Sequence, residues 1–140
     1  MNELVAFITN HWVLSALFTM LLVGFFINEA VQQKIQAPRI NAEQAVQLIN
    51  HQEARVLDLR SESLFSAGHI LGALPFSASV LEKKLETLQK HINKPLIVVC
   101  ALGQESPKVA LQLRDKGFQT VVLNGGIQAW KEAGLPLVKA

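Results

Sequence analysis

Apolar residues are distributed unevenly along the chain, and their pattern predicts an apolar N-terminal segment followed by a mixed domain. No formally charged side chain occurs in residues 4–27, and residues 12–27 are almost entirely Leu, Val, Phe, Ala, Met and Ile. A helix of about 20 such residues covers the hydrocarbon core of a bilayer. The pattern therefore predicts one transmembrane helix at about residues 5–28, in contact with membrane lipid, within an N-terminal segment of residues 1–31.

Two alternatives to a membrane span are a buried core helix and a cleavable signal peptide. A core helix in so small a domain would be apolar on all faces. A signal peptide needs a basic leader, whereas Glu3 is the only charged side chain before the apolar run. Lys34 and Arg39 follow the span and no Lys or Arg precedes it. The positive-inside rule then predicts a single-pass protein of the bacterial inner membrane with its C-terminal domain in the cytoplasm.

After a polar linker at residues 32–37, helical and strand patterns alternate through a domain of residues 38–140. Asn41 is typical of an N-cap, and Ser106 followed by Pro107 is typical of an N-cap and the first helical residue. Short apolar runs predict strands, and 3.6-residue spacing predicts the helices between them. The strands are expected at residues 56–59, 96–99 and 118–123, and the helices at residues 42–49, 81–91 and 107–116 and around Trp130. This alternation predicts an α/β domain with a parallel sheet flanked by helices.

Composition narrows the classes of function. The 140 residues suffice for one domain, and 50% hydrophobic residues make wholesale disorder improbable. The net charge is +2 and the basic residues are scattered, which indicates no nucleic-acid partner. Cys100 is the single cysteine, so an intrachain disulfide is excluded and a reducing compartment is favoured. His51, His69 and His91 are not spaced as a ligand set, so no metal site is expected.

Cys100 has the sequence context of a nucleophile. It follows the apolar run 96–99 and precedes a loop and a helix start, and ligands bind at such carboxyl ends of parallel strands. Gly103 permits the positive φ that lets backbone N–H groups surround the sulfur and favour the thiolate. The alternative is an inert buried thiol. The predicted substrate-binding loop comprises Ala101, Leu102, Gly103, Gln104, Glu105 and Ser106.

Several blocks of the domain, in order, resemble a single-domain rhodanese. They are residues 56–60, Phe65, residues 68–70, residues 72–73, the Cys100-x-x-Gly103-x-x-Ser106 loop, residues 123–126 and Trp130. The resemblance covers about residues 38–140 and implies a five-stranded parallel sheet between helices. It also implies a sulfurtransferase or persulfide carrier without a cofactor, in which the Cys100 thiolate accepts sulfane sulfur from a small molecule or protein and passes it to a thiophilic acceptor.

The loop departs from rhodanese-like loops that act on thiosulfate. Those loops often carry a basic residue just after the cysteine and an arginine just before the serine, where this chain has Ala101 and Glu105. A carboxylate beside a dianion is repulsive. Thiosulfate is therefore not expected to be the physiological donor, and a protein persulfide, a small persulfide or a cationic donor is left open. The alternative function is a catalytically weak docking domain that binds a protein partner at the membrane.

The other shared residues are interpreted as structural. Asp58 and Arg60 are expected to hold the fold together, His69 to occupy a turn, and Trp130 to lie in the core. Related cysteine-dependent phosphatases need an arginine six residues after the nucleophile to hold phosphate. Ser106 stands at that position, which argues against phosphatase activity.

Overall fold

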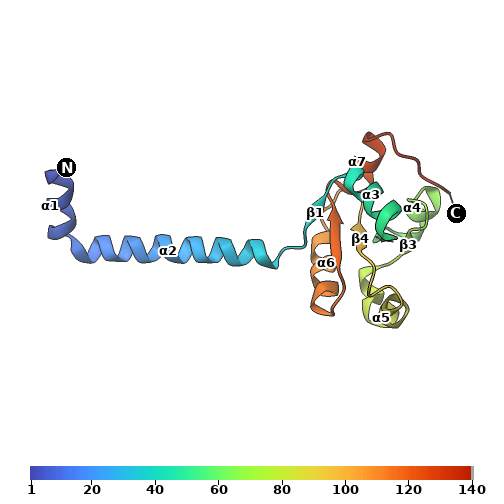
Figure 1. The fold of residues 1–140 in the computed structure, drawn as a ribbon, viewed down its shortest axis with the longest axis horizontal. Helices are drawn as coiled ribbons and strands as arrows, with labels where there is room; N and C mark the ends of the chain where they lie inside the picture. Colours follow the sequence, from blue (N-terminus) through green and yellow to red (C-terminus); the bar gives the residue numbers. More distant parts are fainter. Residues whose placement is uncertain (140) are drawn as a thin grey trace. The chain divides into compact units, whose positions relative to one another are not determined.

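A computed structural model describes residues 1–139, and the chain divides into two compact units, Met1–Gln36 and Ala37–Ala140 (Figure 1). The first unit holds two helices, α1 (Asn2–Asn10) and α2 (Trp12–Ile35). They are separated at His11, whose φ of −122° and ψ of 40° leave the helical region. The expectation of one helix over residues 5–28 and a linker from residue 32 is therefore corrected. Asn10 and His11 are weak helix formers, which favours an interruption there, whereas the polar residues after residue 28 continue α2.

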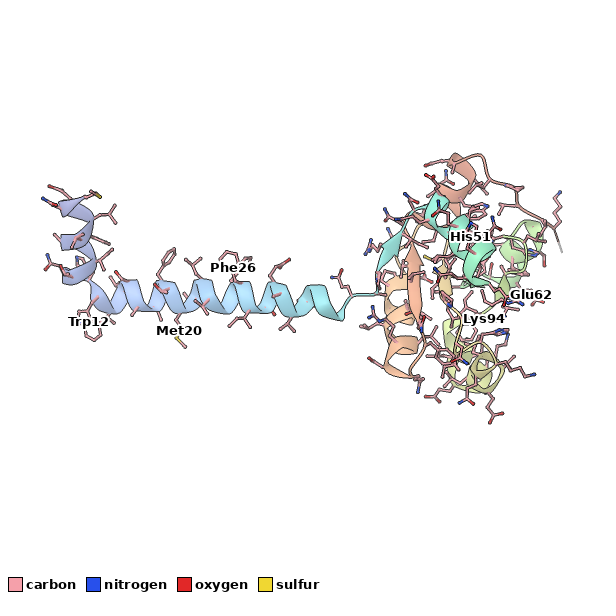
Figure 2. All side chains as sticks on the ribbon, in the orientation of Figure 1. Trp12, Met20, Phe26, His51, Glu62 and Lys94 are labelled. Carbon is pink, nitrogen blue, oxygen red and sulfur yellow. The ribbon has the colours of Figure 1, made fainter. Side chains whose placement is uncertain are left out.

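Helix α2 exposes apolar side chains on all sides. Residues 12–32 form a helix that is long and apolar enough to cross a membrane, and none of the span is buried. Figure 2 shows Met20 and Phe26 on opposite sides of the helix, and their side chains are 74% and 66% exposed. A core helix of a soluble protein would be mostly buried, so this alternative is not supported.

The second unit contains a five-stranded parallel sheet with the order β1-β5-β4-β2-β3 (Figure 1). The strands are β1 (Arg39–Ile40), β2 (Arg55–Asp58), β3 (Leu74–Pro75), β4 (Leu96–Val99) and β5 (Thr120–Leu123). The predicted α/β class and the five parallel strands are confirmed. The central strand β4 is buried along its whole length, as its continuous apolar run predicts.

Helices cover both faces of the sheet. They are α3 (Ala42–Gln52), α4 (Glu62–Ala67), α5 (Leu81–Gln89), α6 (Ser106–Asp115) and α7 (Gly126–Glu132), with a 3-10 turn at Ala78–Val80. Side chains alternate across the pleat of β4. Val98 joins the cluster that includes Leu113 of α6, and Ile97 joins the cluster that includes Trp130 of α7. Two apolar layers therefore fix the sheet from both sides.

The start of α3 confirms one local prediction. The Asn41 side chain accepts a hydrogen bond from the backbone N–H of Gln44 at 2.8 Å. The Gln44 side chain in turn accepts one from the Asn41 N–H at 3.0 Å. This reciprocal capping box satisfies two backbone donors that the helix leaves without partners. It fixes where the chain leaves β1 and enters α3.

Candidate active site

The order of the strands brings the ends of β2 and β4 together. In the sheet, Asp58 pairs with Val99, and the Leu59 N–H donates to the Val99 carbonyl at 2.8 Å. From this pair the chain continues outward in opposite directions, to β3 on one side and to β5 on the other. Ligands bind in the crevice that such a switch point leaves at the carboxyl ends of the strands. Cys100 is the first residue after β4 and therefore lies at this crevice.

The loop after β4 turns back over the sulfur of Cys100. The backbone N–H of Gly103 donates to Sγ at 3.1 Å. Gly103 has a φ of 83°, and a Cβ at this position would lie 3.0 Å from the backbone nitrogen of Gly125. The predicted positive φ is confirmed, and the close approach to Gly125 is a second reason for glycine that the sequence did not indicate.

Ser106 has a different role from the predicted N-cap. Helix α6 begins at Ser106, Glu105 is its N-cap, and no side chain caps the helix. The Ser106 side chain is fully buried, and its Oγ lies 3.4 Å from Cys100 Sγ. Ser106 is thus a hydrogen-bond partner of the sulfur, which donates to it as a thiol and accepts from it as a thiolate.

Two opposing influences set the acidity of the Cys100 thiol. Burial raises its pKa, because a thiolate is poorly solvated inside a protein. Hydrogen bonds from the Ser106 side chain and from the backbone N–H groups of Ser106, Glu105 and Gly103 lower the pKa. The hydrogen bonds outweigh burial, so the pKa lies below its ordinary value of 9.0. The loop therefore favours the nucleophilic form of the sulfur.

Helix α7 holds the loop after β4 through backbone hydrogen bonds. Its first N–H groups donate to the carbonyl oxygens of the loop, from Ile127 to Cys100 at 2.9 Å and from Gln128 to Ala101 at 3.2 Å. A Cβ at Gly126 would lie only 2.2 Å from the Cys100 carbonyl oxygen. The sequence placed Gly125 and Gly126 at the start of the last helix and within the resemblance, without this contact to the loop. The structure assigns Gly126 the role of allowing this close approach.

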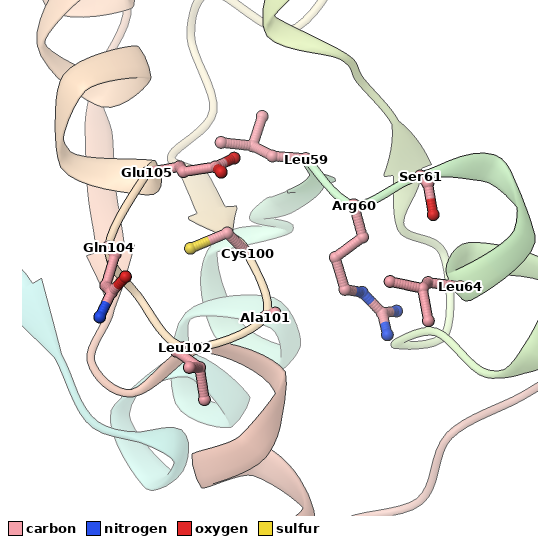
Figure 3. A pocket seen from close by; sticks show the side chains of 9 residues that line it. All are labelled: Leu59, Arg60, Ser61, Leu64, Cys100, Ala101, Leu102, Gln104 and Glu105. Carbon is pink, nitrogen blue, oxygen red and sulfur yellow. The ribbon is translucent and has the colours of Figure 1, made fainter.

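A pocket of about 280 Å³ opens beside Cys100 (Figure 3). Its lining residues come from the loop after β4 and from the segment after β2. They are Leu59, Arg60, Ser61, Leu64, Cys100, Ala101, Leu102, Gln104 and Glu105. Four of the predicted loop residues line the pocket, while Gly103 and Ser106 contact the sulfur instead. Sequence analysis missed the residues after β2, since their place depends on β2 and β4 being neighbours.

Arg60 lines the pocket, but its guanidinium is held by other groups. Nε donates to Asp58 Oδ1 at 3.0 Å, and Nη2 donates to Asp58 Oδ2 and to the Gly68 carbonyl, both at 2.7 Å. Asp58 is fully buried and the Arg60 side chain is 7% exposed. This bidentate pair joins the end of β2 to the end of α4, as expected for a structural pair.

His69 and Trp130 also have structural partners. The His69 ring stacks on Phe65 with ring centroids 3.9 Å apart, and its Nδ1 lies 2.9 Å from the Phe65 carbonyl oxygen. Trp130 is buried, and its indole N–H donates to the Pro136 carbonyl at 3.1 Å. Neither residue lines the pocket at Cys100.

Comparison with known proteins identifies the family. The family described as "Rhodanese-like domain" matches residues 41–133, which include both the segment after β2 and the cysteine loop. The chain belongs to the rhodanese-like domain family. The resemblance inferred from the sequence is thereby confirmed for most of the second unit.

Relatives of this rhodanese-like chain extend over different lengths. The uncharacterized protein YibN of Escherichia coli (strain K12) is 33% identical over 141 residues, covering 99% of both chains. The thiosulfate sulfurtransferase GlpE of Shewanella oneidensis is 34% identical over 95 residues, covering 67% of this chain and 92% of the relative. Among solved structures, a rhodanese-related protein from Thermoplasma volcanium matches with a TM-score of 0.67 and 31% identity, covering 74% of this chain and 99% of that one. GlpE and the Thermoplasma volcanium protein therefore match part of this chain over nearly the whole length compared, whereas YibN matches nearly all of it.

Proposed function

We propose that the protein is a sulfurtransferase, or a persulfide carrier, in which Cys100 accepts sulfane sulfur and passes it to a thiophilic acceptor. The observation that carries this proposal is the set of hydrogen-bond donors around Sγ, here called the cage. Three backbone N–H groups and one hydroxyl lower the pKa of Cys100 beside an open pocket. A thiolate with access to a pocket is a competent nucleophile. The similarity to GlpE, described as a thiosulfate sulfurtransferase, supports the same reaction class.

The first half of the proposed reaction is a displacement at sulfur. The Cys100 thiolate attacks the outer sulfur of a donor R–S–SH, a bond forms between Sγ and that sulfur, and the S–S bond that joined the outer sulfur to the R–S group breaks. The electron pair leaves with R–S⁻, and the proton stays on the transferred sulfur. No oxidant is needed, and the loop N–H groups that stabilise the thiolate also stabilise the anionic form of the persulfide.

The second half returns the enzyme to its starting state. A thiophilic acceptor, such as a thiolate, attacks the outer sulfur of the Cys100 persulfide, and Cys100 leaves as the thiolate. The hydrogen bonds from Ser106 and Gly103 favour this leaving group, because they lower the pKa of Cys100. The same cage therefore assists both halves of the transfer.

The membrane segment determines where this chemistry would occur. We propose that residues 12–32 anchor the chain in the bacterial inner membrane as a single span, with the rhodanese-like domain in the cytoplasm. Support comes from the length and apolar composition of α2 and from Lys34 and Arg39, which follow the span without any basic residue before it. Protease added to spheroplasts should cleave the domain only after lysis. Cleavage before lysis would reverse the proposed orientation.

Intact mass spectrometry of the detergent-purified full chain tests the chemistry. Treatment with an organic persulfide, or more slowly with inorganic polysulfide, should add the mass of one sulfur atom, dithiothreitol should remove it, and Cys100→Ser should prevent it. Because Cys100 is the single cysteine, no other thiol can account for the added mass. If no sulfur is added to the native chain, the docking-domain alternative, in which the fold binds a protein partner at the membrane, replaces this proposal.

A further inference from the structure

The pocket beside Cys100 has an unusual balance of charge. Of its nine lining residues, only Arg60 and Glu105 carry a formal charge. The Arg60 charge is balanced by Asp58 through the bidentate pair, and Nε and Nη2 are both occupied. No ion pair of Glu105 occurs within residues 1–139. The pocket with its supporting pair therefore carries a net negative charge, even before the Cys100 thiolate is counted.

Glu105 is placed where it affects an incoming donor. It is the residue before Ser106, and its backbone N–H contributes to the cage around the sulfur. Figure 3 shows its carboxylate reaching from the loop toward Leu59, on one side of Cys100. A dianionic donor approaching Sγ would meet this carboxylate and the thiolate together. The position of the Glu105 carboxylate therefore disfavours the approach of fully ionised inorganic donors to Sγ.

The rest of the lining is mostly apolar, with Ser61 and Gln104 as its uncharged polar residues. Large apolar residues that are exposed in residues 37–139 number four: Leu64, Leu71, Ile92 and Leu102. Two of these four, Leu64 at 50% exposure and Leu102 at 61%, line the pocket at Cys100, and Figure 3 shows them near the Arg60 side and the loop side of the pocket. Leu59 and Ala101 extend the apolar lining. Exposed apolar residues gathered at one pocket indicate a surface that binds an apolar group.

We infer that the pocket selects organic persulfides with an uncharged apolar body over anionic sulfur donors. Glu105 opposes negative charge on the donor, and Leu64 with Leu102 contacts its organic body. The inference rests on the proposed function, since it concerns the donor for Cys100. In the step itself, the apolar body R leaves as R–S⁻ while the outer sulfur and its proton pass to Sγ, so no further reactant is required.

Two donors that differ in body and charge test the inference on the full chain in detergent. Rates of Cys100 persulfide formation are measured by intact mass with benzyl persulfide and with thiosulfate. Each variant's rate is divided by the wild-type rate for the same donor, which cancels the different intrinsic reactivities of the donors. The comparison therefore reports only on the pocket.

Charge reversal is the first pair of variants. Glu105→Arg should raise the relative rate with thiosulfate at least about tenfold more than the relative rate with benzyl persulfide, because a cation replaces an anion beside the sulfur. Glu86→Arg is the matched control, since Glu86 is exposed on α5 and lines no part of this pocket. It changes the net charge of the chain equally and should alter neither rate.

Removal of an apolar contact is the second pair. Leu102→Ser should lower the relative rate with benzyl persulfide about fivefold to tenfold more than the relative rate with thiosulfate, because burial of the benzyl group is lost. Leu71→Ser is the control, since Leu71 is equally apolar and 75% exposed but lies outside this pocket.

The outcomes separate the inference from the proposed function. If neither donor and no polysulfide adds sulfur to Cys100, the proposed sulfur transfer fails. If sulfur is added but Glu105→Arg and Leu102→Ser change the two donors' rates in parallel, the transfer stands and the selection of apolar donors is overturned. If each variant changes the two relative rates unequally in the stated direction, and neither control variant does so, the inference is supported.

Discussion

Leu21 of α2 and Leu96 of β4 have the same side chain and opposite surroundings. Leu21 is 65% exposed, and Leu96 is not exposed at all. In Ala37–Ala140, apolar residues face each other across a sheet and the helices supply the second layer. In Met1–Gln36, the apolar residues have no such partner within their own unit, and no residue of α1 is buried. The apolar side chains of the first unit are therefore left exposed, whereas those of the second unit are covered by its own sheet and helices.

The two units also differ in their proposed roles, since the first would anchor the protein and the second contains the candidate active site. The residues that contact Sγ, line the pocket and support the loop all belong to the second unit. The Thermoplasma volcanium relative matches this part of the chain over 99% of its own length. The domain should therefore fold and react without the helices that precede it.

Removal of residues 1–36 tests the separation most directly and should have the largest effect. The full chain should sediment almost entirely with membranes, and the shortened chain should be almost entirely soluble, because the apolar surface of α2 is gone. Fractionation followed by immunoblotting measures the shift. Cys100→Ser in the full chain is the control and should remain in the membrane fraction. A full-length chain in the soluble fraction would refute the proposed anchor.

Matched leucine truncations test the contrast in burial. Leu96→Ala should lower the free energy of unfolding of the domain by about 2–5 kcal/mol, because it leaves a cavity in the core. Leu21→Ala should leave that free energy unchanged. Denaturant unfolding followed by Trp130 fluorescence measures both, in a Trp12→Phe background so that a single tryptophan reports. Similar losses for the two variants would mean that α2 contributes to the stability of the domain.

Two glycines extend the comparison to the active loop. Gly24 in α2 has no atom within 4 Å of an added Cβ, whereas a Cβ at Gly126 would collide with the Cys100 carbonyl oxygen. Gly126→Ala should lower the rate of Cys100 persulfide formation about 100-fold, since small displacements of reacting groups have effects of this size.

Gly24→Ala and Gly134→Ala serve as controls for the glycine test. Gly134 shares the positive φ of Gly126, but an added Cβ there meets no atom within 4 Å. Its replacement therefore isolates backbone strain, which costs about 1 kcal/mol or somewhat more. A persulfide rate for Gly126→Ala equal to that of Gly134→Ala would show that the contact with the loop is unimportant.

The smallest expected effect concerns the acidity of Cys100. The pH dependence of iodoacetamide alkylation should have its midpoint below 9.0, because the hydrogen bonds in the folded domain outweigh the effect of burial on the pKa. Ser106→Ala should move the midpoint upward, since it removes one of these hydrogen bonds. Ser63→Ala, on the exposed side of α4, should not move it. A midpoint at or above 9.0 for the native protein would contradict an activated thiolate.

The same pKa difference predicts how stability varies with pH. The thiolate is favoured more in the folded state than in the unfolded state, so folding is favoured as the thiol ionises. This contribution is fully present above the unfolded pKa of about 9.0 and is lost as the pH falls through the lower folded pKa. Cys100→Ser should abolish this part of the pH dependence, and denaturant midpoints at several pH values measure it.

Much of the fold follows from local pattern. The continuous apolar runs identify β2 and β4 to within one residue, and the Asn41 box marks the start of α3. The two-residue edge strands β1 and β3 were not predicted, because two residues display no periodicity. The interruption at His11 was missed for a related reason, since apolar composition continues through it and only backbone conformation changes.

In the candidate site, too, some features follow from local sequence pattern and others do not. Cys100 and Gly103 lie within one short loop, so the sequence pattern identifies them, whereas Glu105 stood out through the resemblance to rhodanese-like loops. The apolar wall from Leu59 and Leu64, the inward turn of the Ser106 hydroxyl and the contact of Gly126 with the loop are not encoded by spacing. They arise because the parallel sheet places the end of β2, the end of β4 and the start of α7 side by side, although the chain separates them by tens of residues.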